Sequence, residues 1–272
     1  MRDQAVKEPG TSADAFDHIG ARYDVEFTNT ELSRWFRARV WQRLGVLFKP
    51  GDQVLELGCG TGEDAIWLAK RGVSVLASDG SQAMIEETAR KAKIEGLESR
   101  VETRLLDFND AANWNLPAQV FDGAYSNYGA LNCIGDWSAI GKRLASAVKP
   151  GGKVGLGVIG PLCPWEIAWH GIHGDFHTAT RRFHKSTVAH LDGSYFNVYY
   201  PTPSRLQDDF GEGFQRTLLW GLGVFLPPSD LYQPVGRRKR LARTLLSLER
   251  LTAPHWPFKY LGDHYWLELV RV

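Results

Sequence analysis

The segment at residues 53–70, QVLELGCGTGEDAIWLAK, constrains the fold more than any other part of the chain. Aliphatic residues at 54–57 favour a short buried strand, and a helical pattern begins at Glu63. Gly58, Gly60 and Gly62 lie between them, so the backbone can turn sharply and approach a ligand closely. The sequence therefore predicts a strand, a tight turn and a helix whose free N–H groups form a binding platform.

The spacing of these glycines separates two classes of ligand. Dinucleotide-binding turns have the pattern G-x-G-x-x-G, with the helix start aimed at a pyrophosphate. Here the pattern is G-x-G-x-G, followed by Glu63 and Asp64. Two acids at a helix start suit the helix dipole but repel a pyrophosphate. We therefore predict an unphosphorylated, positively charged ligand, and an NAD(P)-dependent oxidoreductase is the alternative with the same fold.

Three more strands follow, and each ends in a residue suited to ligand binding. The strands expected at 73–78, 101–106 and 120–126 lead to Asp79, Asp107 and Asn127. Because the carboxyl ends of parallel strands meet at one edge of a sheet, these side chains should lie near the glycine turn. Each residue alone is also a common helix cap or loop residue, so the inference depends on their order. A helix at 137–148, a KPGG turn and a strand at 153–158 continue the alternation.

The sequence ELGCGTG at 56–62, together with these strand ends, resembles the class I S-adenosylmethionine-dependent methyltransferases. The resemblance covers residues 20–160. It implies an α/β, doubly wound, seven-stranded sheet whose last strand, at 265–272, is antiparallel. It also implies S-adenosylmethionine as methyl donor and S-adenosylhomocysteine as product. The cofactor-binding residues that it implies are Tyr23, Glu56, Gly58, Cys59, Gly60, Gly62, Asp79, Gly80, Ser81, Met84, Asp107, Phe108 and Asn127.

The resemblance assigns a part of the donor to several of these residues. Asp79 would accept from the ribose hydroxyls, and Met84 would lie against the adenine. Asp107 and Phe108 would read the adenine amino group and pack near the ring, while Asn127 would meet the methionine part. A tyrosine such as Tyr23 would contact the donor's carboxylate end, and packing of a lid is its alternative role.

The chain divides into four predicted parts. Residues 1–50 form an N-terminal helical lid with a short helical segment from Asp14 and a helix at 31–47, and polar residues 1–12 are expected to be mobile. Residues 51–160 form the cofactor-binding core, and residues 161–192 are an inserted helical cap over the substrate. Residues 193–272 complete the sheet, with strands at 194–200 and 215–224, a helix at 203–210 and a rigid loop at 226–229.

The cap carries two interleaved patterns at helical spacing. One is apolar: Trp165, Trp169, Ile172, Phe176, Ala179 and Phe183. The other is titratable and polar: Glu166, His170, His173, His177, Thr180 and His184. Gly174 and Asp175 are expected to break the helix between them. The polar row is interpreted in three ways: as a solvated face, as a pocket wall with a general base, or as a metal site at His170 and His173.

We predict no metal and assign the row to the acceptor pocket. The candidate catalytic residues are Glu166, His170 and Tyr128. The candidate substrate-binding residues are Tyr128, Trp165, Trp169, His173, His177 and Arg181.

The predicted reaction is in-line transfer of a methyl group to a small lipophilic molecule, in which most of the catalysis comes from positioning. One alternative is C-methylation of an isoprenyl diphosphate, with the diphosphate held by Arg181, Arg182, His184 and Lys185. In that case Tyr128, Trp165 or Trp169 would stabilise a cation through the ring face. A non-catalytic protein that binds S-adenosylmethionine is a further alternative.

Charge and cysteine content limit the partners and the compartment. Lys+Arg number 32 and Asp+Glu 31, so no overall basic field favours nucleic acid as a partner. Cys59, Cys133 and Cys163 are odd in number and lack a C-x-x-C pair, which favours a reducing, cytoplasmic location. No secretory signal and no apolar run of about 20 residues is visible, so no membrane span is expected.

A basic, leucine-rich segment at 237–251 has two interpretations. It is either a helix with a solvated charged side and a packed leucine side, which we favour, or a helix that lies on an anionic membrane. The leucines concerned are Leu241, Leu245, Leu248 and Leu251.

Overall fold

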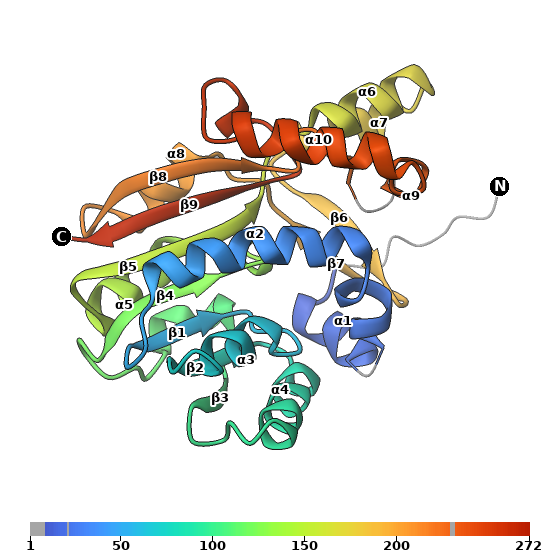
Figure 1. The fold of residues 1–272 in the computed structure, drawn as a ribbon. Helices are drawn as coiled ribbons and strands as arrows, with labels where there is room; N and C mark the ends of the chain where they lie inside the picture. The colour runs from blue at the N-terminus through green and yellow to red at the C-terminus, as the bar shows by residue number, and fades with distance from the viewer. Residues whose placement is uncertain (1–8, 21, 229–231) are drawn as a thin grey trace.

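The protein has a seven-stranded sheet between two layers of helices (Figure 1). The computed structural model describes residues 9–20, 22–228 and 232–272. The spatial order of the strands is β3 (Val101–Leu105), β2 (Ser74–Asp79), β1 (Gln53–Leu57), β4 (Phe121–Ser126), β5 (Val148–Ile159), β9 (His264–Arg271) and β8 (Phe214–Leu222). β1 to β5 pair in parallel, whereas β9 is antiparallel to both β5 and β8. The predicted sheet with its antiparallel last strand is therefore confirmed.

Helices pack on both faces because the central strands are apolar on both sides. Val54 of β1 belongs to the core under α2 (Glu31–Leu47), α3 (Glu63–Ala69) and α4 (Gln82–Ile94). The next residue, Leu55, belongs to the core under α5 (Ser138–Ala147) and α8 (Pro203–Phe210) on the other face. Successive side chains of a strand point to opposite faces, so an uninterrupted apolar run is what a doubly covered strand needs.

The strand order reverses between β1 and β4, and this position fixes the site. β1 is paired with β2 on one side and with β4 on the other. The chain leaves neighbouring strands in opposite directions at such a point, which opens a crevice beyond their carboxyl ends. The loops after β1, β2 and β4 meet at this crevice.

Most predicted boundaries agree with the structure, but the KPGG segment differs. The helices predicted at 31–47 and 203–210 are confirmed as α2 and α8. Residues 149–152 do not form a turn before a strand, because they lie inside β5 as an irregularity of its pairing with β4. Val148 pairs with Phe121 and Lys153 with Gly123, so the extra residues bulge out, with Gly151 at φ +77°.

The N-terminal segment is more ordered than predicted. Helix α1 (Ser12–Ile19) begins at residue 12, and its N-cap Thr11 accepts a hydrogen bond from the Asp14 N–H at 3.2 Å. A hairpin of β6 (Thr187–Leu191), which the sequence analysis missed, and β7 (Ser194–Val198) packs on α1. Residues 1–8 of the predicted mobile segment, and Ser229 of the predicted loop, lie outside the described residues. A π-helical turn, η1 (Asp24–Thr28), leads from α1 toward α2.

The cap insertion is a helical hairpin that stands at one end of the molecule (Figure 1). It consists of α6 (Pro164–Ile172), α7 (Phe176–Thr180) and the 3-10 turn η4 (Arg181–Phe183). The predicted break is confirmed: Gly174 has φ +77°, and the Asp175 carboxylate accepts from the Thr178 N–H at 3.0 Å. Three further short 3-10 helices are η2 (Phe108–Asn113), η3 (Ala130–Cys133) and η5 (Phe258–Tyr260).

The basic helix α10 (Lys239–Thr252), which follows α9 (Tyr232–Gly236), corrects our interpretation of its leucines. Ala242 and Glu249 are buried, whereas Leu248 and Leu251 are 39% and 70% exposed. Half-buried Leu245 and Leu246 also pack against the core, whereas three of the four predicted leucines, Leu241, Leu248 and Leu251, are exposed. Among the described residues, we find no helix that is both long enough and apolar enough to cross a bilayer.

Candidate functional site

The glycine turn after β1 adopts a backbone that only glycine tolerates well. Gly58 has φ +75°, and a Cβ there would lie 2.1 Å from the Cβ of Ala130. Gly60 has φ +52° and no atom within 4 Å of a Cβ position, so its open side faces free space. Gly62 is the left-handed N-cap of α3 and is packed against Thr88, away from that space. Gly58 therefore serves close packing, and Gly60 leaves room for a ligand.

Asp79, at the end of β2, is held against this turn by backbone N–H groups. Its Oδ2 accepts from the Gly60 N–H at 2.9 Å and its Oδ1 from the Ser81 N–H at 3.0 Å. Burial raises the pKa of Asp79, and the backbone hydrogen bonds oppose that shift. Ser81 itself caps α4 by accepting from the Met84 N–H. The carboxylate is thus fixed in position with lone pairs left for further donors.

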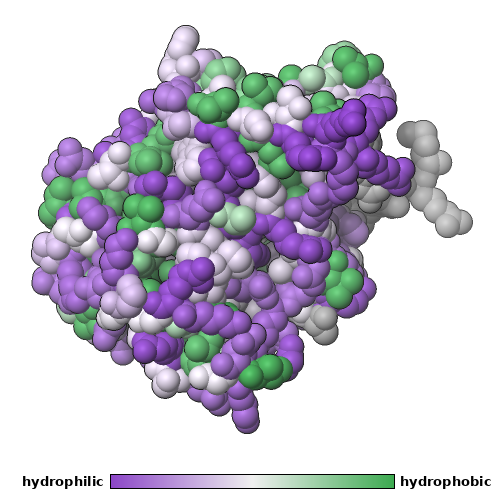
Figure 2. Space-filling model, in the orientation of Figure 1, coloured by the Kyte–Doolittle hydropathy of each residue, from purple (hydrophilic) through white to green (hydrophobic). Residues whose placement is uncertain are grey.

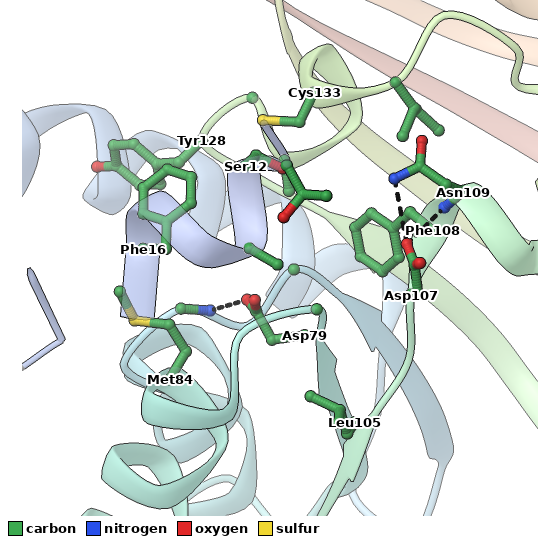
Figure 3. A pocket seen from close by; sticks show the side chains of 18 of the residues that line it. Ser12, Phe16, Asp79, Met84, Leu105, Asp107, Phe108, Asn109, Tyr128 and Cys133 are labelled. Carbon is green, nitrogen blue, oxygen red and sulfur yellow. Dashed lines mark hydrogen bonds between the residues drawn. The ribbon is translucent and has the colours of Figure 1, made fainter. Parts of the chain in front are cut away.

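A cavity of about 290 Å³ lies beyond these strand ends (Figure 3). Asp79 and Met84 line its floor, and Asp107, Phe108 and Asn109 lie on one side of it. The lining also includes Thr11, Ser12, Ala13, Phe16, Tyr23, Gly58, Gly60, Gly80, Leu105, Asn127, Tyr128, Gly129, Ala130, Cys133 and Ile134. The crevice that the strand order creates is therefore a real cavity, and most of the predicted cofactor residues surround it.

The other side of the cavity is aromatic. Phe16 and Tyr128 face it in Figure 3, and Tyr23 stands edge-on to Phe16 with their ring centroids 6.1 Å apart. The Tyr128 hydroxyl donates to the Ser33 carbonyl of α2 at 2.5 Å, so the ring rather than the hydroxyl is free for a ligand. Tyr128 also has φ +52°, a conformation that the surrounding hydrogen bonds must maintain.

A second, smaller hollow of about 40 Å³ adjoins the cavity and is strongly polar. Its lining includes Glu56, Arg37 and Asp64, together with Tyr23 and Tyr128, which border both spaces. Burial, followed by the charge of Asp64, raises the pKa of Glu56 well above its ordinary value. Glu56 Oε2 and Arg37 Nε are buried and have no hydrogen-bond partner among the described residues. This hollow therefore contains one hydrogen-bond acceptor and one donor that lack partners among the described residues.

The acids after the glycine turn do not act as predicted. Glu63 lies 2.7 Å from Lys91 Nζ, and Asp64 Oδ1 accepts from Arg37 at 2.6 Å and from Trp41 at 2.7 Å. Arg37 pairs with Asp64, and Lys91 is shared between Glu63 and Asp24, so the acids repel an anion less than the sequence suggested. Asp64 instead orients Asn127, whose Nδ2 donates to Asp64 Oδ2 at 2.8 Å.

Cys59 is the remaining predicted cofactor residue in the turn, and it is buried beside Gly60 in the small hollow. Burial raises the pKa of its thiol well above the ordinary value. It therefore fills space as a thiol rather than acting as a nucleophile.

The structure does not bring the predicted cap residues to this cavity. Glu166 is 2% exposed and accepts two hydrogen bonds from Arg181 and two from Arg182, at 2.7–3.1 Å. Burial alone would raise the pKa of Glu166, but these hydrogen bonds outweigh it and keep the pKa below the ordinary value. A carboxylate held in this way is a poor general base.

Other predicted members of the cap are directed elsewhere as well. His170 Nδ1 lies 3.4 Å from an Asp175 oxygen, and the His173 ring stacks on Trp169 with centroids 4.4 Å apart. His173, His177 and Trp169 are exposed, and none of these residues lines the cavity. Trp165 does not line it either. The described residues contain no group of three potential metal ligands.

The structure shows functional candidates that the sequence analysis missed. Ser12 and Phe16 reach the cavity from α1, where a helical segment was expected from Asp14 but no role in the site. Arg37 comes from α2, a helix that the sequence analysis assigned only to the lid. Its guanidinium lies 4.5 Å from the centroid of the Tyr128 ring. Cys133 completes the lining from η3. Only the glycine turn and the strand ends gave a sequence signal for a site here.

Comparison with known proteins agrees with this geometry. The methyltransferase domain family matches residues 54–152, which contain the glycine turn, Asp79, Asp107 and Asn127. This part of the chain therefore matches a methyltransferase domain, and the similar proteins include S-adenosylmethionine-dependent methyltransferases. Demethylmenaquinone methyltransferase of Corynebacterium glutamicum strain R is 35% identical to this chain over 156 residues. That match covers 54% of this chain and 59% of the relative, so it spans little more than half of either protein.

Solved structures share the fold at low sequence identity. An S-adenosylmethionine-dependent methyltransferase of Mesorhizobium loti has a TM-score of 0.54 and 17% identity, covering 89% of this chain and 99% of that one. Geranyl diphosphate C-methyltransferase of Streptomyces coelicolor A3(2) has a TM-score of 0.57 and 13% identity, covering 89% and 78%. In both cases the similarity of fold extends beyond the matched domain to 89% of this chain.

The residues around the cavity fit S-adenosylmethionine, the methyl donor of this family. The open side of Gly60 provides room that a side chain would fill. Asp79 is a buried acceptor beside it, as two vicinal hydroxyls need. The unpaired Glu56 Oε2 and Arg37 Nε suit the ammonium and carboxylate of an amino acid.

Proposed function

We propose that the protein transfers a methyl group from S-adenosylmethionine to a small, lipophilic and uncharged acceptor. The observation that supports this most directly is the division of the cavity into two halves. One half offers carboxylates, at Asp79 and Asp107, and the other offers Phe16, Tyr23 and Tyr128. Such a cavity suits a polar donor and an apolar acceptor.

On the donor side, we propose that each polar group holds one part of the cofactor. Asp79 accepts from the ribose hydroxyls, while Asp107, Phe108 and Met84 surround the adenine. Glu56 and Arg37 hold the amino-acid end in the small hollow. The donor supplies a methyl group made electrophilic by its sulfonium. The protein's part is to align the acceptor with that methyl and to exclude water.

On the acceptor side, the lining has no cation to bind a phosphate. Among the described residues, the lining of the main cavity contains no lysine, arginine or histidine. Arg181 and Arg182, the proposed diphosphate ligands of the alternative, are paired with Glu166 instead. The likeness to geranyl diphosphate C-methyltransferase concerns the fold alone. We therefore propose a neutral acceptor, in line with the demethylmenaquinone named for the Corynebacterium relative.

The acceptor side also offers little for proton removal. Burial raises the pKa of Tyr23 to about 12 and that of the Cys133 thiol to about 11. Neither group takes a proton readily near pH 7, because each is already protonated there. We propose that the acceptor reacts as an electron-rich carbon or as a group that ionises by itself, and that the protein supplies positioning.

The test has two parts, which separate the donor from the acceptor. Calorimetry should show binding of S-adenosylmethionine and S-adenosylhomocysteine, and Asp79→Asn should weaken it by about ten- to a hundred-fold, since hydrogen bonds to a charged group contribute about 1.5–3 kcal/mol. Asp208→Asn, at an exposed position of α8, is the matched control. Binding of NAD(P) without binding of S-adenosylmethionine or S-adenosylhomocysteine would refute the proposed methyl donor.

The acceptor is tested by transfer of labelled methyl to two lipophilic compounds. A short-chain 1,4-naphthohydroquinone is neutral, whereas geranyl diphosphate is anionic. We expect label in the hydroquinone. Transfer to geranyl diphosphate alone would show that the polarity argument is incorrect. The reducing, cytoplasmic location predicted from the cysteines remains a proposal, and the described Cys59, Cys133 and Cys163 are free thiols.

A further inference from the structure

Helix α10 exposes a stripe of leucines that folding does not require. Leu241, Leu248 and Leu251 are 39%, 39% and 70% exposed. Their spacing of seven and three residues places them on one side of the helix. The helix is fixed to the protein by its other side, where Ala242 and Glu249 are buried. None of the residues that the structure describes covers this leucine stripe.

Other large apolar residues are exposed at the same end of the molecule. Ile172 and Phe176, at the tip of the α6–α7 hairpin, are 78% and 69% exposed, and Trp256, in the turn after α10, is 78% exposed. The two segments join at their base, because the Gly262 N–H donates to the Leu162 carbonyl at 2.9 Å. Figure 1 shows α6, α7 and α10 together at the top of the view. We call Ile172, Phe176, Leu241, Leu248, Leu251 and Trp256 the apolar end.

Cations are concentrated on the α10 side of the apolar end, although the chain as a whole has a formal charge of only +1. One of them, Lys239, is paired with Glu31 at 2.9 Å. Residues 237–260 contain seven lysines and arginines, namely Arg237, Arg238, Lys239, Arg240, Arg243, Arg250 and Lys259. Their only acid is Glu249, which is buried and accepts from the N–H groups of Gly223, Val224 and Phe225. In Figure 2, green apolar groups along the upper edge lie beside a broad purple cluster.

We propose that the apolar end docks on an anionic lipid surface. Leucine, isoleucine and phenylalanine side chains would enter the outer part of the bilayer, and Trp256 would occupy the interface, where tryptophan is enriched. The arginines beside the leucine stripe would contact acidic headgroups. A second copy of this chain fits less well, because a twofold interface would bring the two basic clusters together. The residues that support this proposal are exposed on the surface, so the proposal does not depend on the identity of the methyl acceptor.

Vesicle binding tests the proposal directly with the purified full-length chain. Vesicles of pure phosphatidylcholine are compared with vesicles that contain 30% phosphatidylglycerol, about the anionic share that gives a strong surface potential. We expect the protein to co-sediment with the anionic vesicles, and 0.5 M salt to release most of it because such charge attraction is screened. Gel filtration of the same protein reports any self-association.

Two double variants separate the apolar part from the charged part. Leu248→Gln/Leu251→Gln keeps good helix formers and should weaken binding at least about ten-fold, because two exposed apolar side chains no longer enter lipid. Arg240→Gln/Arg243→Gln should weaken binding to anionic vesicles about twenty-five-fold, or about five-fold for each cation. Lys93→Gln/Ile94→Gln, at the end of α4, removes one exposed cation and one apolar residue elsewhere and should bind as wild type does.

The outcomes that oppose the proposal are distinct. The proposal is wrong if the wild-type protein binds neither kind of vesicle. It is also wrong if the control variant loses as much binding as the two test variants. A dimer that dissociates in Leu248→Gln/Leu251→Gln would assign the apolar end to a second copy instead. Retained binding of S-adenosylhomocysteine by each variant shows that the fold is intact. None of these results bears on the proposed methyl transfer.

Discussion

Replacing Gly60 by alanine tests the candidate site more sharply than any charge change, because the chain contains a matched control. Gly60 and Gly96 both have positive φ, +52° and +66°, and neither has an atom within 4 Å of its Cβ position. Gly60 borders the cavity after β1, whereas Gly96 follows α4 on the surface. Any difference between the two variants therefore reports the ligand rather than the backbone.

The two variants should lose similar stability. A non-glycine residue in the left-handed region costs about 1–2 kcal/mol. For a domain of this size, each 1 kcal/mol lowers Tm by about 2–4 °C, so both variants should melt a few degrees below wild type. Thermal unfolding without ligand measures this part. A much larger loss in Gly60→Ala would mean that the space beside this glycine is not open.

Ligand binding should differ strongly between them. The new methyl group at residue 60 enters the space proposed for the donor, and overpacking of this kind costs about 1–3 kcal/mol. Calorimetry with S-adenosylhomocysteine should give a Kd raised by about five- to a hundred-fold in Gly60→Ala and unchanged in Gly96→Ala. Equal affinity in both variants would refute the assignment of the glycine turn to the donor.

Three further predictions concern the cap and the aromatic wall. Glu166→Gln should lower the free energy of unfolding by about 3 kcal/mol, because buried Arg182 loses a partner. It should lower kcat by far less than the roughly hundred-fold caused by loss of a general base. A larger fall in kcat of the folded protein would show that Glu166 takes part in catalysis. Unfolding of the wild type from pH 7 to pH 3 should show stability falling below about pH 4.5, and Glu166→Gln should flatten part of that fall; an unchanged slope would contradict this. Tyr128→Phe loses the hydrogen bond to Ser33 and should lower the free energy of unfolding by about 1 kcal/mol with little change in kcat. A strong loss of kcat would show that the hydroxyl takes part in the chemistry.

The sign of the pH effect follows from two depressed pKa values. Burial alone would raise the pKa of both carboxylates, but Arg181 and Arg182 lower that of Glu166, and His264 and Arg182 lower that of Asp263. Each pKa is therefore lower in the folded protein than in the unfolded chain. Such groups stabilise the fold above the unfolded-state pKa and lose that contribution as the pH falls toward the folded-state value.

The sequence was most informative where local chemistry and backbone geometry coincide. Gly58 and Gly60 need positive φ, and the acid at the end of β2 follows one strand later. These requirements are local, so they are visible as spacing along the chain. The same holds for Gly174 and Asp175, which end α6 and cap α7 as predicted.

The sequence was least informative where the partner of a side chain decides its role. Glu166 and the cap histidines have the residue types of a catalytic row, yet Glu166 accepts from two arginines 15 and 16 residues further on. Helical spacing shows which residues share a face, but it does not show what that face meets. The leucines of α10 illustrate the same limit, since spacing alone did not reveal that most of them are exposed.

By itself, the sequence determined the alternation of strands and helices, the glycine turn and the acids at the strand ends, because these depend on short-range backbone preferences and on apolar periodicity. Only the tertiary structure decided that α1 and Arg37 join the site, that the cap stays away from it, and that a basic, apolar end faces outward. Those features depend on contacts between segments far apart in the chain, and no local pattern encodes the distance between them.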